Sequence, residues 1–306
     1  MPASTSPLIS PAALAASCEG PAAPVVLDVR CPPATAPRPE GSTVPPGRVE
    51  HDAAHIPGAV HLDLDTDLAD PPGAGGRHPL PAVARLEAAL RRAGVRTDSS
   101  VVVHDHGDGS YAARAWWLLR WAGLPAERVA VLDGGWAAWT GQGLPVTATA
   151  SRPEPGDVVV RPGHMPVLDA DGAAAVVEAR GVLLDARSHA RFRGDTEPVD
   201  PVAGRIPGAV NLPATELVDT DGRWPAAAEL AGRLGALGVR ADRPTGAYCG
   251  SGVTAAALVL AVEHAGVRPP TDPVPLYPGS WSQWCADPSR PVATGPAGRD
   301  HLPSRP

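Results

Sequence analysis

Lysine is absent from this chain of 306 residues, and all 26 of its basic side chains are arginine. A P-loop needs a lysine that reaches the β- and γ-phosphates of a nucleotide, and a Schiff base needs a lysine amine, so both kinds of chemistry are excluded. The formal net charge of -7 argues against a nucleic-acid partner, because phosphate neutralisation requires a basic face. Arginine is therefore the side chain that we expect to bind an anionic substrate.

Long apolar runs and closely spaced cysteines are also missing. No apolar run reaches the roughly 18 residues that span a membrane, and the N-terminus lacks a basic segment followed by a hydrophobic stretch. The four cysteines, Cys18, Cys31, Cys249 and Cys285, are far apart and lack the paired spacing of a zinc site. We therefore expect a cytoplasmic monomer that has no membrane partner and binds no metal or other cofactor.

Several short phrases occur twice in the chain, in the same order. They are Leu-Asp-Val-Arg at 27–30 and Leu-Asp-Ala-Arg at 184–187, Ile-Pro-Gly-Ala-Val at 56–60 and 206–210, the stretches 111–123 and 254–266, and the pairs Trp136/Trp139 and Trp281/Trp284. Chance similarity does not preserve order over such distances, so the sequence predicts two homologous domains. We place them at 1–150 and 167–291, with a linker at 151–166 and a tail at 292–306.

Each copy alternates short apolar runs with longer helical patterns, which is typical of parallel α/β units. The predicted strands lie at 25–29, 101–104, 129–132, 182–185, 246–248 and 274–277, and the predicted helices at 81–93, 110–122, 226–237 and 253–264. The sequence thus predicts an α/β fold in which each domain has a mainly parallel sheet flanked by helices. The first copy is longer, and we place its extra residues in the proline-rich stretch 31–47.

Cys249 lies in the most informative segment, Tyr-Cys-Gly-Ser-Gly-Val-Thr at 248–254, between a predicted strand and a predicted helix. Open α/β sheets place their ligands at the carboxyl ends of the strands. Gly250 and Gly252 allow the backbone to curl so that its N–H groups point inward, and the following helix adds its positive end. Such a nest stabilises a thiolate, which favours a nucleophilic Cys249 over an inert core cysteine.

Two other cysteine chemistries fit the sequence less well. A tyrosine-phosphatase-type loop needs an arginine six positions after the cysteine, where this chain has Ala255. A Cys-His protease gives no reason for a repeated domain. We therefore set both aside.

The duplicated domain, the repeated Ile-Pro-Gly-Ala phrase and Cys-Gly-Ser-Gly-Val-Thr-Ala at 249–255 resemble the tandem-domain rhodanese family of sulfurtransferases, from about Leu8 to Pro291. In that family, thiosulfate enzymes typically carry Arg and Lys after the cysteine, whereas 3-mercaptopyruvate enzymes carry Gly-Ser-Gly, as at 250–252. The resemblance implies that Cys249 takes sulfur from 3-mercaptopyruvate as a persulfide, releases pyruvate, and passes the sulfur to a thiol, a thioredoxin-like reductant or cyanide. A thiosulfate donor, and a non-enzymatic sulfur carrier or interaction module with the same fold, remain alternatives.

The resemblance also implies a proton relay. Ser251 would be the hydroxyl member of a Ser-His-Asp set. His78, in Arg-His-Pro-Leu-Pro at 77–81, matches the family's His-Met-Leu-Pro phrase, with a proline in place of the methionine. The acidic member would be Asp65, which we prefer to Asp63.

Substrate binding is expected from arginine and from the cysteine loop. Arg191 matches the family's first substrate arginine, and a guanidinium suits bidentate binding of a carboxylate. The second arginine would fall where this chain has Val199 and Asp200, so it stays unassigned. Arg205 supplies a nearby charge, although a structural role is equally expected, and Arg187 is expected to be structural. The substrate-binding loop residues implied are Gly250, Gly252, Val253 and Thr254.

The first copy has no cysteine at the position equivalent to Cys249. A gapless alignment places His106 there, and an alignment with one inserted residue places Asp105 there. Either way, the resemblance implies that the N-terminal domain is catalytically silent.

Overall fold

A computed structural model describes residues 6–31 and 44–296, in two compact units. Unit 1 comprises Met1–Asp70, Pro81–His164 and Val218–Trp224, and unit 2 comprises Pro71–Leu80, Met165–Leu217 and Pro225–Pro306. Short segments are therefore exchanged, because 71–80 belongs to the unit built mostly from the second copy. Most of the predicted insertion at 31–47, and residues 297–306 of the predicted tail, lie outside the described residues.

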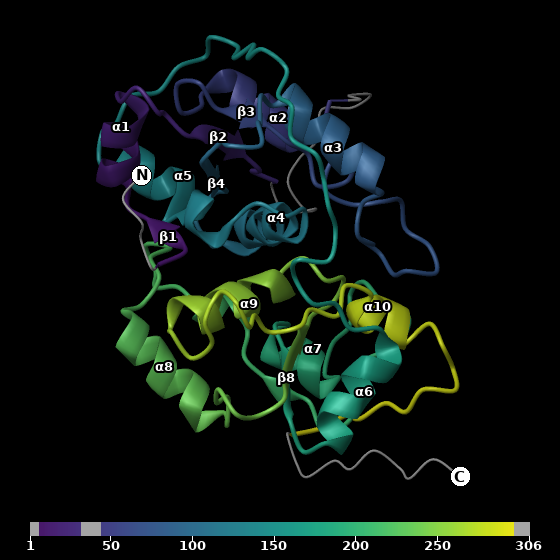
Figure 1. The fold of residues 1–306 in the computed structure, drawn as a ribbon. Helices are drawn as coiled ribbons and strands as arrows, with labels where there is room; N and C mark the ends of the chain where they lie inside the picture. Colours follow the sequence, from purple (N-terminus) through teal and green to yellow (C-terminus); the bar gives the residue numbers. More distant parts are fainter. Residues whose placement is uncertain (1–5, 32–43, 297–306) are drawn as a thin grey trace. The chain divides into compact units, whose positions relative to one another are not determined.

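Unit 1 contains a parallel five-stranded sheet in the order β1-β5-β4-β2-β3 (Figure 1). Its strands are β1 (Leu8–Ile9), β2 (Val25–Asp28), β3 (Val60–His61), β4 (Val101–His104) and β5 (Val129–Leu132). Its helices are α1 (Pro11–Cys18), α2 (Pro46–Ala53), α3 (Val83–Arg92), α4 (Ser110–Trp121), the 3-10 turn η1 (Ala126–Arg128) and α5 (Gly135–Gly141). The valine-rich strands β4 and β5 are buried along their whole length, and α4 packs against both.

Unit 2 contains a parallel three-stranded sheet in the order β7-β6-β8. Its strands are β6 (Val182–Asp185), β7 (Val210–Asn211) and β8 (Thr245–Tyr248). Its helices are α6 (Ala170–Glu178), α7 (His189–Arg193), the 3-10 turn η2 (Ala214–Glu216), α8 (Ala227–Ala236), α9 (Ala255–His264) and α10 (Ser280–Trp284). Two parallel sheets flanked by helices confirm the predicted fold class.

The segment 274–277 differs from its prediction as a strand. It runs along β8, where the N–H of Ala247 donates to the carbonyl of Pro275 at 3.0 Å, but only Leu276 forms isolated bridges. Proline has no N–H to donate, so Pro275 interrupts the ladder. The strand prediction was therefore wrong in its hydrogen bonding.

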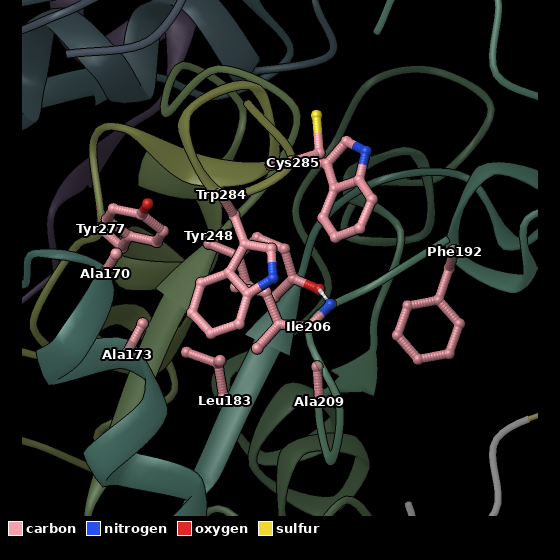
Figure 2. Close-up of a cluster of buried hydrophobic side chains, with 11 residues drawn as sticks. Ala170, Ala173, Leu183, Phe192, Ile206, Ala209, Tyr248, Tyr277, Trp284 and Cys285 are labelled. Carbon is pink, nitrogen blue, oxygen red and sulfur yellow. Dashed lines mark hydrogen bonds between the residues drawn. The ribbon is translucent and has the colours of Figure 1, made fainter. Parts of the chain in front are cut away.

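Aromatic side chains fill the core of unit 2 and support the end of β8. Figure 2 shows Trp284 of α10 beside Tyr248 and Leu183, and a dashed line joins the Tyr248 hydroxyl to the backbone N–H of Ile206, a distance of 3.2 Å. Tyr248 is the last residue of β8. Its buried ring and hydrogen bond therefore anchor the residue directly before Cys249.

The repeated Leu-Asp-x-Arg phrases form equivalent ion pairs. Arg30 donates to Asp28 and to the carbonyl of Ala54, and Arg187 donates to Asp185 and to the carbonyl of Gly204. Each guanidinium also lies over a tryptophan of its own unit, at 4.3 Å from the ring centroid of Trp136 and 4.8 Å from that of Trp281. Both arginines thus tie loops to the strand ends, the structural role expected for Arg187.

No helix in the described part of the chain is long and apolar enough to cross a membrane.

Candidate active site

Cys249 is the first residue after β8, and it is almost completely buried. The backbone N–H of Gly252 donates to its Sγ at 3.1 Å. Gly252 has a φ of +79°, and a Cβ at this position would lie 2.3 Å from the carbonyl oxygen of Pro278. Only glycine fits both the conformation and the space, so the loop that directs an N–H at the sulfur depends on this residue.

Helix α10 holds the cysteine loop from the other side. The N–H groups of Trp281 and Ser282 donate to the carbonyls of Cys249 and Gly250, both at 2.9 Å. The Oγ of Ser280 accepts the N–H of Cys249 at 3.1 Å, and Ser280 has a φ of +52°, which is rare for a residue with a side chain. This strained serine supplies the hydroxyl that fixes the backbone of Cys249, as strained residues at functional sites often do.

The predicted pair of His78 and Ser251 is brought together within unit 2. Nδ1 of His78 lies 2.8 Å from Oγ of Ser251. Segment 71–80 carries His78 and is fastened to α10, because the N–H of Arg77 donates to Oγ of Ser282 at 3.0 Å and the amide of Gln283 donates to the carbonyl of Ala74 at 2.9 Å. The family resemblance implied this pair, although the two residues are far apart in the chain.

Asp65 lies in unit 1, where its side chain is exposed and its N–H donates to Oδ1 of Asp63 at 3.1 Å. Its pairing with His78 stays a prediction.

Arg191 and a second arginine, Arg77, both lie at the cysteine loop. A Cβ built on Gly250 would be 3.1 Å from Nη2 of Arg77 and 3.3 Å from Nη1 of Arg191. Asp200 bridges the two guanidinium groups, through Oδ1 to Arg77 at 2.5 Å and Oδ2 to Arg191 at 3.1 Å. Sequence reasoning missed Arg77, although it directly precedes His78 in the 77–81 phrase.

Glu197 completes this cluster of charges. Its carboxylate accepts Nε of Arg191 at 3.2 Å and Nη2 at 2.7 Å. Burial alone would raise the pKa of Glu197, but hydrogen bonds from Arg191 and from the N–H groups of Val199 and Asp200 hold it below its usual value. Glu197 is therefore an anion that fixes the plane of the Arg191 guanidinium.

Three other predicted binding residues, Val253, Thr254 and Arg205, lie outside this cluster of charges. Val253 and Thr254 lead from the loop into α9, and their carbonyls accept the N–H groups of Ala256 and Ala257. Arg205 is completely buried, where it donates to the carbonyls of Gly295 and Pro296 at 2.7 and 3.3 Å and lies 4.7 Å from the ring centroid of Phe192. This geometry favours the structural role for Arg205.

In unit 1, Asp105 occupies the position of Cys249. It follows β4 as Cys249 follows β8, and its carbonyl accepts the N–H of Trp136 at 2.8 Å, as that of Cys249 accepts the N–H of Trp281. The alignment with one inserted residue is therefore the structural one, and His106 is equivalent to Gly250.

The carboxylate of Asp105 fills the amide nest of its own loop. Oδ1 accepts the N–H groups of Gly107 and Gly109 at 2.9 and 3.2 Å, and Oδ2 accepts those of Tyr111 and Ala112, both at 3.1 Å. Burial and the neighbouring Asp108 raise the pKa of Asp105 to about 6, against the effect of these donors. The equivalent loop in unit 1 thus surrounds a carboxylate and has no sulfur nucleophile.

Comparison with known proteins agrees with this duplicated arrangement. The chain matches the rhodanese-like domain at residues 10–142 and 169–287. It is 47% identical over 247 residues to a probable 3-mercaptopyruvate sulfurtransferase of Pseudomonas aeruginosa, covering 79% of this chain and 84% of that protein. It is 43% identical over 260 residues to a putative thiosulfate sulfurtransferase, SseB, of Mycobacterium tuberculosis, covering 83% and 88%.

A solved structure is similar over almost its entire length. SseA of Escherichia coli, described as a 3-mercaptopyruvate sulfotransferase, aligns with a TM-score of 0.74 and 32% identity over 90% of this chain and 99% of its own. The family match covers both copies of the repeat. The chain therefore belongs to the rhodanese-like family, with two rhodanese-like domains, and is an enzyme with sulfurtransferase activity.

Proposed function

We propose that this enzyme transfers the sulfur of 3-mercaptopyruvate through a persulfide on Cys249 to a thiol, a thioredoxin-like reductant or cyanide, and releases pyruvate. The observation that carries the proposal is the loop 249–252. There an amide N–H points at the cysteine sulfur, and Ser251, two residues later, is hydrogen-bonded to His78. The loop therefore combines a stabilised nucleophile with a group that moves a proton.

In the first half-reaction, the Cys249 thiolate attacks the sulfur of 3-mercaptopyruvate. An S–S bond forms, the C–S bond of the donor breaks, and its electron pair passes to the pyruvate fragment as an enolate. The enolate carbon then takes a proton, which gives pyruvate. We assign this proton delivery to the Ser251 hydroxyl in contact with His78, with Asp65 as the acidic member of the relay.

In the second half-reaction, an acceptor thiolate or cyanide attacks the outer sulfur of the persulfide. The products are an acceptor persulfide or thiocyanate, and Cys249 leaves as a thiolate. The same Gly252 N–H is placed to stabilise the Cys249 thiolate that attacks in the first half-reaction and the thiolate that leaves in the second.

Donor binding is assigned to Arg191 and to the loop backbone. The Arg191 guanidinium faces Gly250, so it is placed to bind the donor carboxylate. Gly250, Gly252, Val253 and Thr254 line the start of α9, where backbone N–H groups favour an anion.

Thiosulfate is the alternative donor, and the name of the Mycobacterium tuberculosis relative favours it. The neutral side chains of Ser251 and Gly252 favour 3-mercaptopyruvate, since they add no cation for a dianion. Initial rates with each donor, at matched concentrations and with cyanide as acceptor, compare the two. We expect a higher kcat/KM for 3-mercaptopyruvate, and a higher value for thiosulfate would reverse the assignment.

A further inference from the structure

We propose that Arg77 is the second cation that binds the carboxylate of the sulfur donor, and that Asp200 is the positioning residue that holds Arg77 and Arg191 as a pair. This inference rests on the proposed function, because it adds a binding residue to the Cys249 site. It fills the place that sequence reasoning left unassigned.

Terminal nitrogens of the two arginines converge on one point of the cysteine loop. Nη2 of Arg77 and Nη1 of Arg191 are the guanidinium nitrogens nearest to the position of a Cβ on Gly250, at 3.1 and 3.3 Å. The two residues reach this point from separate segments, 71–80 and α7. Glycine at 250 leaves the space in which both nitrogens approach the residue next to the nucleophile.

Other nitrogens of both arginines are bound to carboxylates that keep the guanidinium groups in place. Arg77 uses Nη1 for Asp200, and Arg191 uses Nε and Nη2 for Glu197 and Asp200. The carboxylates are buried, with 4% and 3% of their side chains exposed, whereas 27% of Arg77 and 20% of Arg191 is exposed. The carboxylates are thus the buried part of the cluster, and the two arginine side chains are its more exposed part.

This arrangement suits a single carboxylate. Two guanidinium groups offer two N–H donors, as bidentate binding of a planar carboxylate requires. Their charges are balanced by Asp200 and Glu197, so the cluster as a whole adds no net charge that would favour a dianion. The pair therefore favours a monoanionic keto acid over thiosulfate.

Replacing Arg77 by glutamine tests the inference when a charged donor is compared with an uncharged one. Mercaptoacetone has the ketone and thiol of 3-mercaptopyruvate but lacks the carboxylate. For Arg77→Gln we expect kcat/KM with 3-mercaptopyruvate to fall about 10- to 100-fold, mainly through KM, because a charge-assisted hydrogen bond is lost. The value with mercaptoacetone should change less than about threefold on the same grounds.

The matched control is Arg193→Gln. Arg193 lies on α7, as Arg191 does, and makes an exposed ion pair with Asp195. This variant should leave both donors unaffected. Asp200→Asn should raise KM for 3-mercaptopyruvate by a smaller factor, because Arg77 keeps its charge and loses only the ion pair that positions it. Should Arg77→Gln unfold, Arg77→Lys preserves the charge, and we expect an intermediate, donor-selective loss.

The failures of the two proposals are distinguishable. If the unmodified enzyme does not turn over 3-mercaptopyruvate, the proposed function is wrong. If it does, and Arg77→Gln matches Arg193→Gln or weakens both donors equally, Arg77 does not bind the carboxylate.

Discussion

Cys249 and Asp105 show how one residue decides what an amide nest does. Cys249 follows β8 and Asp105 follows β4, and the carbonyl of each accepts an N–H from the first turn of a short helix, α10 or α5. In unit 1 the carboxylate accepts four backbone N–H groups, so the nest is occupied by its own side chain. In unit 2 the cysteine sulfur accepts one N–H of the loop, that of Gly252. We expect this donor to stabilise a thiolate at Cys249.

Gly252→Ala tests whether the loop conformation sets reactivity. The added Cβ would meet the carbonyl of Pro278 at a left-handed φ, so the loop must move. We expect a loss of about 1–3 kcal/mol of stability and about 10²-fold in kcat/KM. Gly266→Ala is the matched control, because Gly266 has a φ of +67° and a methyl group added there would have nothing within 4 Å. Gly266→Ala should lower the stability, measured by thermal unfolding, and leave kcat/KM unchanged. Equal losses of kcat/KM in the two variants would contradict a role of the loop conformation in reactivity.

The contact between His78 and Ser251 predicts linked mutational effects. His78→Asn and Ser251→Ala should each lower the rate of pyruvate release about 10²-fold with little change in KM, because each breaks the same proton path. The double variant should fall no further than the worse single variant. Single-turnover kinetics measure this step, with His189→Asn, an exposed histidine bonded to Asn211, as the control. Fully additive losses would contradict a shared relay.

At the scale of elements, the segment 71–80 delivers two site residues to unit 2. It does so through α10, where Ser282 accepts the N–H of Arg77 and Gln283 donates to the carbonyl of Ala74. Gly76 also lies against α10, since a Cβ there would be 2.7 Å from the carbonyl of Gly279. The positions of Arg77 and His78 therefore depend on how firmly this segment is fastened.

Ser282→Ala should loosen the segment without replacing a residue that is assigned to the reaction or to donor binding. Removing one partly buried hydrogen bond costs about 1 kcal/mol, so the backbone N–H groups of 71–80 should exchange with solvent about fivefold faster. We expect kcat/KM to fall in parallel. Hydrogen exchange with peptide mass analysis measures the first effect. Ser289→Ala, in an exposed turn with Asp287, is the control, and unchanged exchange in 71–80 would contradict the fastening role.

The sequence allowed the prediction of those strands that have a distinct run of apolar residues. Valine-rich runs gave the strands 101–104 and 129–132 at their observed bounds, because burial on both faces demands apolar residues. The two-residue strands β1, β3 and β7 were not predicted, since so short a run has no periodicity. The strand at 274–277 failed because proline broke the ladder.

Some residues of the candidate site could likewise be predicted from the sequence, and others could not. Cys249, Ser251 and His78 stand in recognisable phrases, and the contact between His78 and Ser251 agrees with the prediction. Arg77 was missed because its role depends on a long-range contact of segment 71–80 that no local pattern encodes. The charge of Asp200 was noted only as a departure, and its function as a bridge required the geometry.

At the scale of the whole molecule, the equivalent strands β4 and β8 of the two copies differ in the buried titratable residue at their ends. β4 ends in His104, in register with Asp28, and β8 ends in Tyr248, in register with Asp185. Burial lowers the pKa of His104 and raises that of Tyr248. The histidine thus titrates in an acidic range where the tyrosine does not.

His104 should make the stability of the enzyme pH-dependent. Because its folded pKa is below its unfolded value, the unfolded chain binds more protons, and stability falls as the pH drops below the unfolded pKa of about 6.5, by at most about 1.4 kcal/mol per pH unit. His104→Tyr, which copies unit 2, should give a shallower profile in urea unfolding. Groups that do not interact with His104 cancel in the difference between the profiles, whereas Asp28, whose pKa His104 lowers, changes with it. His164→Gln, at an exposed histidine, is the control, and identical profiles for all three proteins would contradict the assignment.

Intact-mass analysis of the enzyme after treatment with 3-mercaptopyruvate tests the central claim most directly. We predict that the protein gains the mass of one sulfur atom with release of one equivalent of pyruvate, loses it to a thiol or cyanide, and repeats the cycle. Cys249→Ser should gain none, although Cys18, Cys31 and Cys285 remain. A gain of sulfur by Cys249→Ser would contradict the account. So would a gain of sulfur by the unmodified enzyme from thiosulfate and not from 3-mercaptopyruvate.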